Sequence, residues 1–186
     1  MSRRHLCLAA AVGALAAAPA AAGPPATDQL LGTFVGVAAD EIRDGAPLEQ
    51  RDVVMELRPY RENGLSLQWN NVTLVDGRRD LPGVKFRRDE ALLVPAPGRS
   101  FFLAGVGYDP FSDKPSIDPI RGDALRWGVA DGDALDLYSF AILEDGTYEL
   151  QATDRHPEGD GIALRFERIV DGKVLRRMTG RAVRAD

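Results

Sequence analysis

The C-terminal third of the chain, residues 124–184, reads ALRWGVADGDALDLYSFAILEDGTYELQATDRHPEGDGIALRFERIVDGKVLRRMTGRAVR. Asp-Gly flanked by alternating hydrophobic residues is the strongest short-range hairpin signal, because a type I′ turn needs positive φ at both central residues. The stretch therefore predicts antiparallel strands joined in sequence order. Its turn signals are Asp131-Gly132, Asp145-Gly146, Gly159-Asp160-Gly161 and Asp171-Gly172.

Alternation between these turns predicts strands with one dry face and one wet face. After Gly161, the apolar residues Ile162, Leu164 and Phe166 share one face. The strand after Gly146 divides in the same way. Its predicted dry face is Tyr148, Leu150 and Ala152, and its predicted wet face is Thr147, Glu149, Gln151 and Thr153.

The N-terminal half continues the pattern. A first strand begins at Leu30, and a second places Val53, Met55 and Leu57 on one face. In the third strand the apolar parity shifts across Asn70-Asn71, which predicts a β-bulge. Later apolar runs predict a fourth strand from Val84 and Phe86, a short fifth run at residues 91–94, and a further strand over residues 101–106.

Eight to ten short strands with a turn every 8–12 residues are typical of an all-β barrel or sandwich. We predict an antiparallel up-and-down meander closed into a single barrel, because sequential hairpins that close leave no exposed edge. A β-sandwich is the alternative.

The first 22 residues have the features of a signal peptide: Arg3 and Arg4, a short apolar run, and Ala20-Ala21-Ala22 before Gly23. We expect residues 23–29 to form a flexible arm and residues 30–186 to form the barrel domain. The protein is then exported, to the periplasm or beyond the cell. Its only cysteine, Cys7, leaves with the signal peptide, so no disulfide is expected.

Removing 22 of the 186 residues leaves 164, with 21 basic and 28 acidic residues and a net charge of −7. This balance argues against nucleic acid and anionic membrane surfaces as partners, because both require clustered positive charge. No segment is expected to insert into a membrane.

Few residues of the mature chain suit catalysis or metal binding. It has no cysteine and one histidine, His156, in a turn beside Pro157, so neither a zinc site nor a nucleophile with a nearby base is expected. We expect no cofactor and no metal site. Calcium is the weaker alternative, since oxygen ligands gather at Asp109, Asp113 and Asp118, and at Asp131 and Asp133.

The two ends of the barrel domain resemble the calycin superfamily, with its lipocalin-like and avidin-like members. Leu31-Gly32-Thr33-Phe34-Val35-Gly36 opens the first strand, and Gly180-Arg181-Ala182-Val183-Arg184 closes the last. The resemblance implies a cup-shaped barrel in which Phe34 plugs the closed end and Arg184 packs across it. Phe34 stands where the superfamily has Trp. Without the resemblance, Phe34 would be a core aromatic residue and Arg184 a solvated strand end.

A barrel of about eight strands can hold one small ligand, and the resemblance implies a small apolar or amphipathic one. Trp69 shares a face with Leu65 and Leu67 and is expected to point inward. Residues 107–122, rich in Pro and Asp, predict a long loop that could cover the mouth or dock a protein partner. The candidate ligand-binding residues, which could instead serve packing alone, are Trp69, Tyr108, Phe111, Trp127 and Tyr138.

Three functions follow, in descending order of support. The first is an exported lipocalin-like barrel that binds a small hydrophobic or amphipathic ligand. The second is a cell-envelope interaction or scaffold protein with a filled barrel. The third is an enzyme, which would need at least two carboxylates facing the cavity.

Overall fold

The computed structural model of the chain describes residues 28–96, 101–104 and 121–185. The predicted signal peptide, and with it the question of export, lies outside these residues. The described part consists of one short 3-10 helix and ten strands. They are η1 (Asp28–Leu30), β1 (Gly32–Arg43), β2 (Gln50–Tyr60), β3 (Gly64–Thr73), β4 (Lys85–Pro95), β5 (Phe101–Ala104), β6 (Leu125–Asp131), β7 (Ala134–Ile142), β8 (Tyr148–Glu158), β9 (Gly161–Val170) and β10 (Lys173–Ala185).

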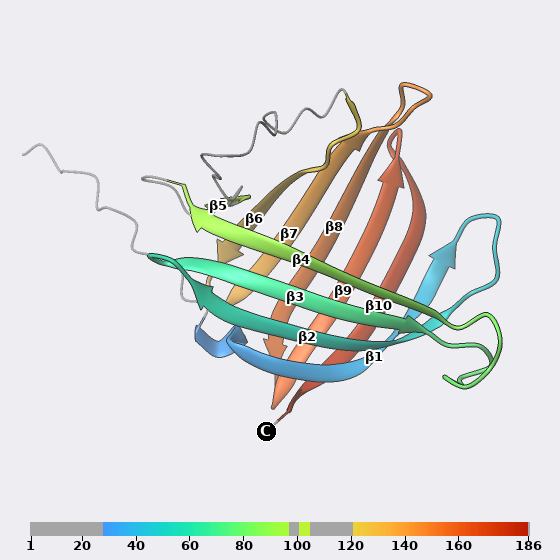
Figure 1. The fold of residues 1–186 in the computed structure, drawn as a ribbon, viewed down its shortest axis with the longest axis horizontal. Helices are drawn as coiled ribbons and strands as arrows, with labels where there is room; N and C mark the ends of the chain where they lie inside the picture. The colour runs from blue at the N-terminus through green and yellow to red at the C-terminus, as the bar shows by residue number, and fades with distance from the viewer. Residues whose placement is uncertain (1–27, 97–100, 105–120, 186) are drawn as a thin grey trace, which may run out of the picture.

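The ten strands form one closed antiparallel barrel (Figure 1). Each strand pairs with the next along the chain, and β10 returns to pair with β1. The seam is long: it runs from Thr33 opposite Ala185 to Arg43 opposite Arg176. The prediction of an up-and-down barrel is therefore confirmed, and the sandwich alternative is wrong.

The turns predicted from the C-terminal third all join consecutive strands. At Asp171-Gly172 both residues have positive φ, 52° and 79°, as a type I′ hairpin requires. At Asp131-Gly132 the pairing of Asp131 with Ala134 makes Gly132 the first central residue, with φ 60°. That places glycine where a type II′ turn needs it.

The bulges lie elsewhere than the sequence pattern suggested. β3 pairs with β2 and β4 in continuous register across Asn70 and Asn71, so the prediction of a bulge there is wrong. The register shifts between Asp40 and Ile42 in β1 and between Val174 and Arg176 in β10. The two runs predicted within residues 84–94 are one unbroken strand, β4, because its exposed polar residues continue the pairing with β3.

The hydrophobic core fills one end of the barrel and closes it. Its members lie at the start of β1, β3, β7 and β9 and at the end of β2, β4, β6 and β10, which meet at the same end of an antiparallel barrel. Leu30 of η1 is fully buried against them. We call this cluster the base; its largest members are Leu30, Phe34, Met55, Leu57, Leu67, Leu93, Phe102, Leu135 and Ile162.

Phe34 and Arg184 meet at the base, directly opposite each other across the seam. The guanidinium carbon of Arg184 lies 4.8 Å from the centre of the Phe34 ring, a cation–π contact. Arg184 also donates hydrogen bonds to the carbonyl oxygens of Leu31 at 2.5 Å and Gln29 at 2.8 Å. The last strand thus holds η1 and the first strand together over the closed end.

The strand β8 reverses the faces that its sequence pattern suggested. Gln151, Thr153 and Arg155 face the barrel interior, where they line a cavity. Leu150 and Ala152 lie on the opposite, outer face of the strand. The predicted dry face of β8 is therefore outside and the wet face inside, because this half of the barrel interior carries polar as well as apolar side chains.

Candidate ligand-binding cavity

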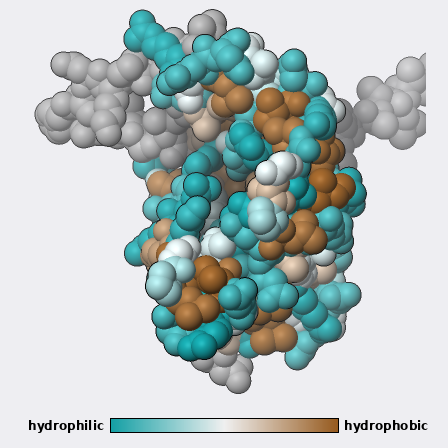
Figure 2. Space-filling model, turned by 90° about the vertical axis from the view of Figure 1, so that its right-hand side faces the viewer, coloured by the Kyte–Doolittle hydropathy of each residue, from teal (hydrophilic) through white to brown (hydrophobic). Residues whose placement is uncertain are grey.

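A cavity of about 150 Å³ occupies the half of the barrel away from the base. It lies toward the end formed by the β1–β2, β3–β4, β7–β8 and β9–β10 connections. Figure 2 shows the molecule from the side of these connections, with hydrophilic residues around a central hollow. Its apolar lining is Ala38, Val53, Met55, Trp69, Leu164, Phe166 and Met178, and its uncharged polar lining is Asn71, Gln151, Thr153 and Thr179. Its charged lining is Arg51, Arg87, Asp89, Arg155 and Arg165.

Arg155 is the most buried charged group of this lining, at 4% exposed. Its Nε donates to the Met55 sulfur across the barrel at 3.0 Å, and its Nη1 donates to the Thr153 carbonyl oxygen at 3.3 Å. Because Met55 lies opposite Phe34 in the register, the guanidinium forms the floor of the cavity, directly above the base.

No carboxylate in the described part of the chain forms an ion pair with Arg155. Burial lowers the pKa of Arg155 to about 10, and the nearby charges of Asp154 and Asp136 partly offset that effect. The group is therefore still a cation at neutral pH. Asp154 and Asp136 are its neighbours from the outer face, and they act on it through the strand rather than by direct contact.

A charge network fixes the mouth of the cavity. The Asp40 carboxylate receives two hydrogen bonds from Arg176, at 2.6 and 2.9 Å, and one from the Glu49 backbone N–H at 2.9 Å. Glu49 also pairs with Arg43 at 2.8 Å and with Arg51 at 3.4 Å. Burial raises the pKa of Glu49, but Arg43 and Arg176 outweigh it, and the net pKa is lowered.

Arg51 lines the cavity just inside this network. Its Nη2 reaches Glu49, whereas its Nε is buried without a hydrogen-bond partner. Burial, and then the charge of Arg176, lowers the pKa of Arg51. The polar half of the cavity is therefore positive at its floor and at its rim.

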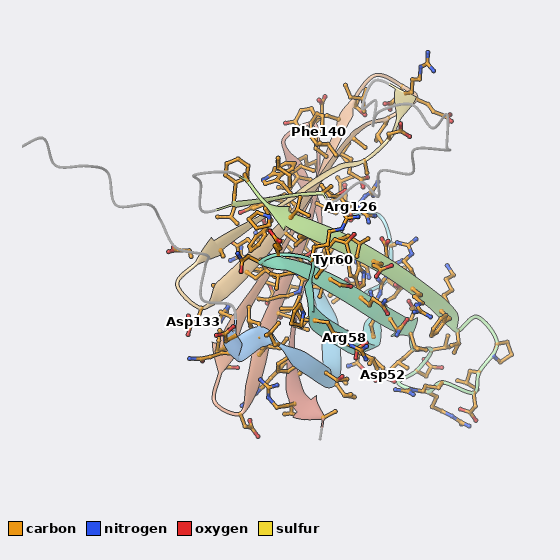
Figure 3. The ribbon with its side chains drawn as sticks, turned by 60° about the vertical axis from the view of Figure 1, so that its left-hand side comes forward. Asp52, Arg58, Tyr60, Arg126, Asp133 and Phe140 are labelled. Atoms are coloured by element: carbon orange, nitrogen blue, oxygen red, sulfur yellow. The ribbon has the colours of Figure 1, made fainter. Side chains whose placement is uncertain are left out.

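A second hollow of about 40 Å³ lies beside the cavity and shares Trp69, Asp89, Gln151 and Thr153 with it. Here Arg126 of β6, which Figure 3 labels, bridges to Asp89 of β4 at 2.9 Å and lies 6.0 Å from the Trp69 ring. Asp89 is the one carboxylate among the lining residues that the structure describes, and Arg126 neutralises it. The two cavity-facing carboxylates that an enzyme hypothesis requires are not present in this lining.

The structure separates the five predicted ligand residues. Trp69 lines both hollows. Trp127 and Tyr138 are direct register partners with stacked rings, 5.2 Å between centres, as their spacing about the Asp131-Gly132 turn suggested. They lie on the outer face, opposite the buried Leu137, although Tyr138 also borders the smaller hollow. Tyr108 and Phe111, with most of the loop at 107–122, lie outside the described residues.

The surroundings of Tyr138 give a testable charge effect. Its hydroxyl bonds the Asp136 carboxylate, and Asp136 lies directly opposite Asp154 in the register. Burial, and then the like charge of Asp154, raises the pKa of Asp136. A raised carboxyl pKa costs stability at every pH above the folded-state value, and the cost disappears below the unfolded value of 3.8.

Asp136→Asn is therefore expected to stabilise the protein at pH 7 by a few tenths of a kcal/mol, since the group is only half-buried. Urea unfolding at pH 7 and pH 3 measures this: the gain should be present at pH 7 and absent at pH 3. Asp133→Asn, the same change in an exposed turn, is the control. A destabilised Asp136→Asn protein at pH 7 would contradict the account.

Sequence reasoning missed the residue that defines the floor. Side chains alternate between the two faces of a strand, so the sequence already placed Arg155 on the same face of β8 as Gln151 and Thr153. Its burial was not readable, because a period of two does not say which face of a strand is inside. Met55 was predicted only to share a strand face with Val53 and Leu57, and its contact with Arg155 depends on the closed barrel.

Other chemistry is limited in the described part of the chain. No three His, Cys, Asp or Glu side chains there lie close enough together to hold a metal ion. His156 is exposed. Among these residues no helix has the length and apolar character needed to cross a membrane.

Comparison with known proteins places the chain by its fold. No family model and no curated protein sequence matches it. A crystal structure of a DUF3598-family protein of unknown function from Nostoc punctiforme matches with a TM-score of 0.53 and 15% identity over 91% of this chain. This chain spans about half, 53%, of that protein. The S-type phycobiliprotein lyase CPES from Guillardia theta matches with a TM-score of 0.45 and 11% identity, over 86% of this chain and 90% of the lyase.

Proposed function

We propose that this protein is an exported, lipocalin-like barrel that binds a small amphipathic molecule in the cavity between its base and its mouth. The observation that supports this most directly is the cavity itself. It lies above a packed base, and apolar side chains from four or more strands line it together with a few polar groups. Ligand sites typically combine apolar walls with a small number of placed polar groups.

The size of the cavity bounds the buried part of the ligand. A dry cavity of about 150 Å³ accommodates a molecule the size of benzene. The volume here is about 150 Å³. The buried portion is therefore one ring or a short chain, and any larger ligand extends through the mouth past Arg51.

The two tryptophans of the chain allow a direct binding test, because Trp69 lines the cavity and Trp127 does not. Trp127→Phe leaves only Trp69, and Trp69→Phe leaves only Trp127. A brominated ligand quenches tryptophan fluorescence on contact, so 4-bromobenzyl alcohol, which is neutral and ring-sized, is a suitable probe. We expect saturable quenching in the Trp127→Phe protein and little in the Trp69→Phe protein.

Equal, unsaturable quenching of both single-tryptophan proteins would mean that the probe does not enter the cavity, and the proposed function would fail. The unbrominated alcohol serves as the control for changes in fluorescence that do not need bromine contact. Export is tested separately, by determining whether the mature protein begins at Gly23 after expression of the full chain.

A further inference from the structure

We propose that the ligand is a carboxylic acid, bound with its carboxylate on the guanidinium of Arg155 at the cavity floor and its apolar part toward the mouth. This inference rests on the proposed function and specifies its ligand class. Three features support it: the unpaired state of Arg155, the position of its neighbouring acids, and the chemistry of the walls.

The first feature is the shortage of acceptors around Arg155. A guanidinium carries five N–H donors, and a thioether sulfur is a weak acceptor. Here one donor faces the Met55 sulfur at 3.0 Å and one faces the Thr153 carbonyl oxygen at 3.3 Å. Nη2 donates to no other residue in the described part of the chain. A buried cation without a counter-charge is costly, so the floor is complementary to an anion.

The second feature is that the nearest acids leave these donors free. Asp154 follows Thr153 in β8 and, by strand alternation, points to the outer face, as does Asp136 on β7. Their charges help to keep Arg155 protonated. Neither forms an ion pair with it, so the charge is retained while the hydrogen-bonding edge faces the cavity.

The third feature is the mixed chemistry of the walls, which suits a carboxylic acid with an apolar part better than a free phosphate ion. Carboxylates match the planar, two-pronged donor edge of a single arginine. Above the floor the lining becomes apolar, with Trp69, Phe166 and Met178. The other buried guanidinium of the lining, Arg51, is already paired with Glu49 at 3.4 Å. Arg87 and Arg165 also border the cavity, but both are exposed, and Arg165 pairs with Glu167. Arg155 is therefore the one fully buried guanidinium of the lining, beside apolar side chains that suit the apolar part of an acid.

The test compares 4-bromobenzoate with 4-bromobenzyl alcohol on the full chain carrying Trp127→Phe, with Trp69 quenching as the readout. A hydrogen bond to a charged group contributes enough to make the acid bind about 10- to 100-fold more tightly than the alcohol. Equal affinities would overturn the inference and leave the proposed function intact. Failure of both probes to quench Trp69 would overturn the proposed function itself.

Arg155→Met then assigns the preference to this residue. We expect it to remove the preference for the acid, because affinity for the acid should fall far more than affinity for the alcohol. Arg58→Met removes an exposed arginine, 70% accessible and paired with Glu56, and should keep the preference. Inorganic phosphate should not displace the acid; if it does, the floor binds anions without regard to the apolar part, and the inference is wrong.

Thermal unfolding separates this role from a structural one. Replacing a buried, unpaired charge with an apolar side chain of similar volume is often neutral or stabilising, so Arg155→Met should melt at or above the wild-type temperature. An Arg155→Met protein that melts far below wild type and retains its preference for the acid would make Arg155 a purely structural residue. If that variant does not fold, Arg155→Lys, which keeps the charge but loses the planar donor edge, should still reduce the preference.

Discussion

Phe34→Ala is expected to destabilise the protein by about 3–5 kcal/mol, the range for truncating a fully buried Phe. Phe34 is 1% exposed, and it packs among the base residues Leu30 and Leu57. The substitution removes the ring, leaves a cavity in the base, and deprives Arg184 of its cation–π partner. Because domains are stable by only about 5–15 kcal/mol, a large share of the total stability would be lost. Urea unfolding followed by circular dichroism measures this.

The matched control is Phe86→Ala, the same substitution at a phenylalanine that is 69% exposed on β4. Surface changes of this kind usually stay within about 0.5 kcal/mol. Similar losses in the two variants would show that the base is not the packed end of the barrel. Arg184→Met tests the seam further: it should cost less than Phe34→Ala, because the Phe34 ring stays buried.

Asp40→Ala is expected to cost about 3 kcal/mol, because it removes one member of a buried ion pair and leaves Arg176 only the more distant Glu49, at 3.2 Å, as its counter-charge. The Asp40 side chain is 0% exposed, and Arg176 bonds both of its oxygens, at 2.6 and 2.9 Å. The Glu49 N–H loses its acceptor as well. This pair joins the β1–β2 hairpin to β10, so the substitution should also loosen the mouth of the cavity.

Asp80→Ala is the control for Asp40→Ala. Asp80 also receives two hydrogen bonds from one arginine, Arg78, but both side chains are exposed. Its loss should leave the unfolding midpoint unchanged, since exposed pairs add little stability. A double-mutant cycle with Arg176→Ala would measure the interaction free energy between Asp40 and Arg176. An Asp40→Ala protein as stable as Asp80→Ala would contradict the described network.

The fold was largely readable from local signals. Asp171-Gly172 specifies its hairpin because the turn geometry needs positive φ at two adjacent residues, and few residue pairs adopt it. Phe34 and Arg184, 150 residues apart in sequence, could be placed together only through the resemblance to calycins. The prediction of a bulge at Asn70-Asn71 failed. The apolar residues of a strand can switch from one face to the other without a bulge where the strand passes from the apolar base to the more polar mouth.

The site was much less readable, for a related reason. The alternation predicted along β8 was correct, but its polar face was predicted to lie outside. The half of the barrel that holds the cavity has polar as well as apolar side chains in its interior. The same ambiguity affected Trp127 and Tyr138, whose pairing followed from the turn and whose position on the outer face did not. Burial of Arg155 without an acidic partner is a property of the closed barrel, to which β2 and β8 contribute from opposite sides.

The most direct test of the central claim is a crystal structure of the wild-type protein with 4-bromobenzoate, in which the anomalous signal of bromine locates the ring. We expect a bromine peak inside the barrel, beside Trp69 and Phe166, and a carboxylate oxygen within about 2.7–2.9 Å of an Arg155 nitrogen. A bromine peak only on the outer surface, or a ring in the cavity with its carboxylate at the mouth and Arg155 untouched, would contradict it.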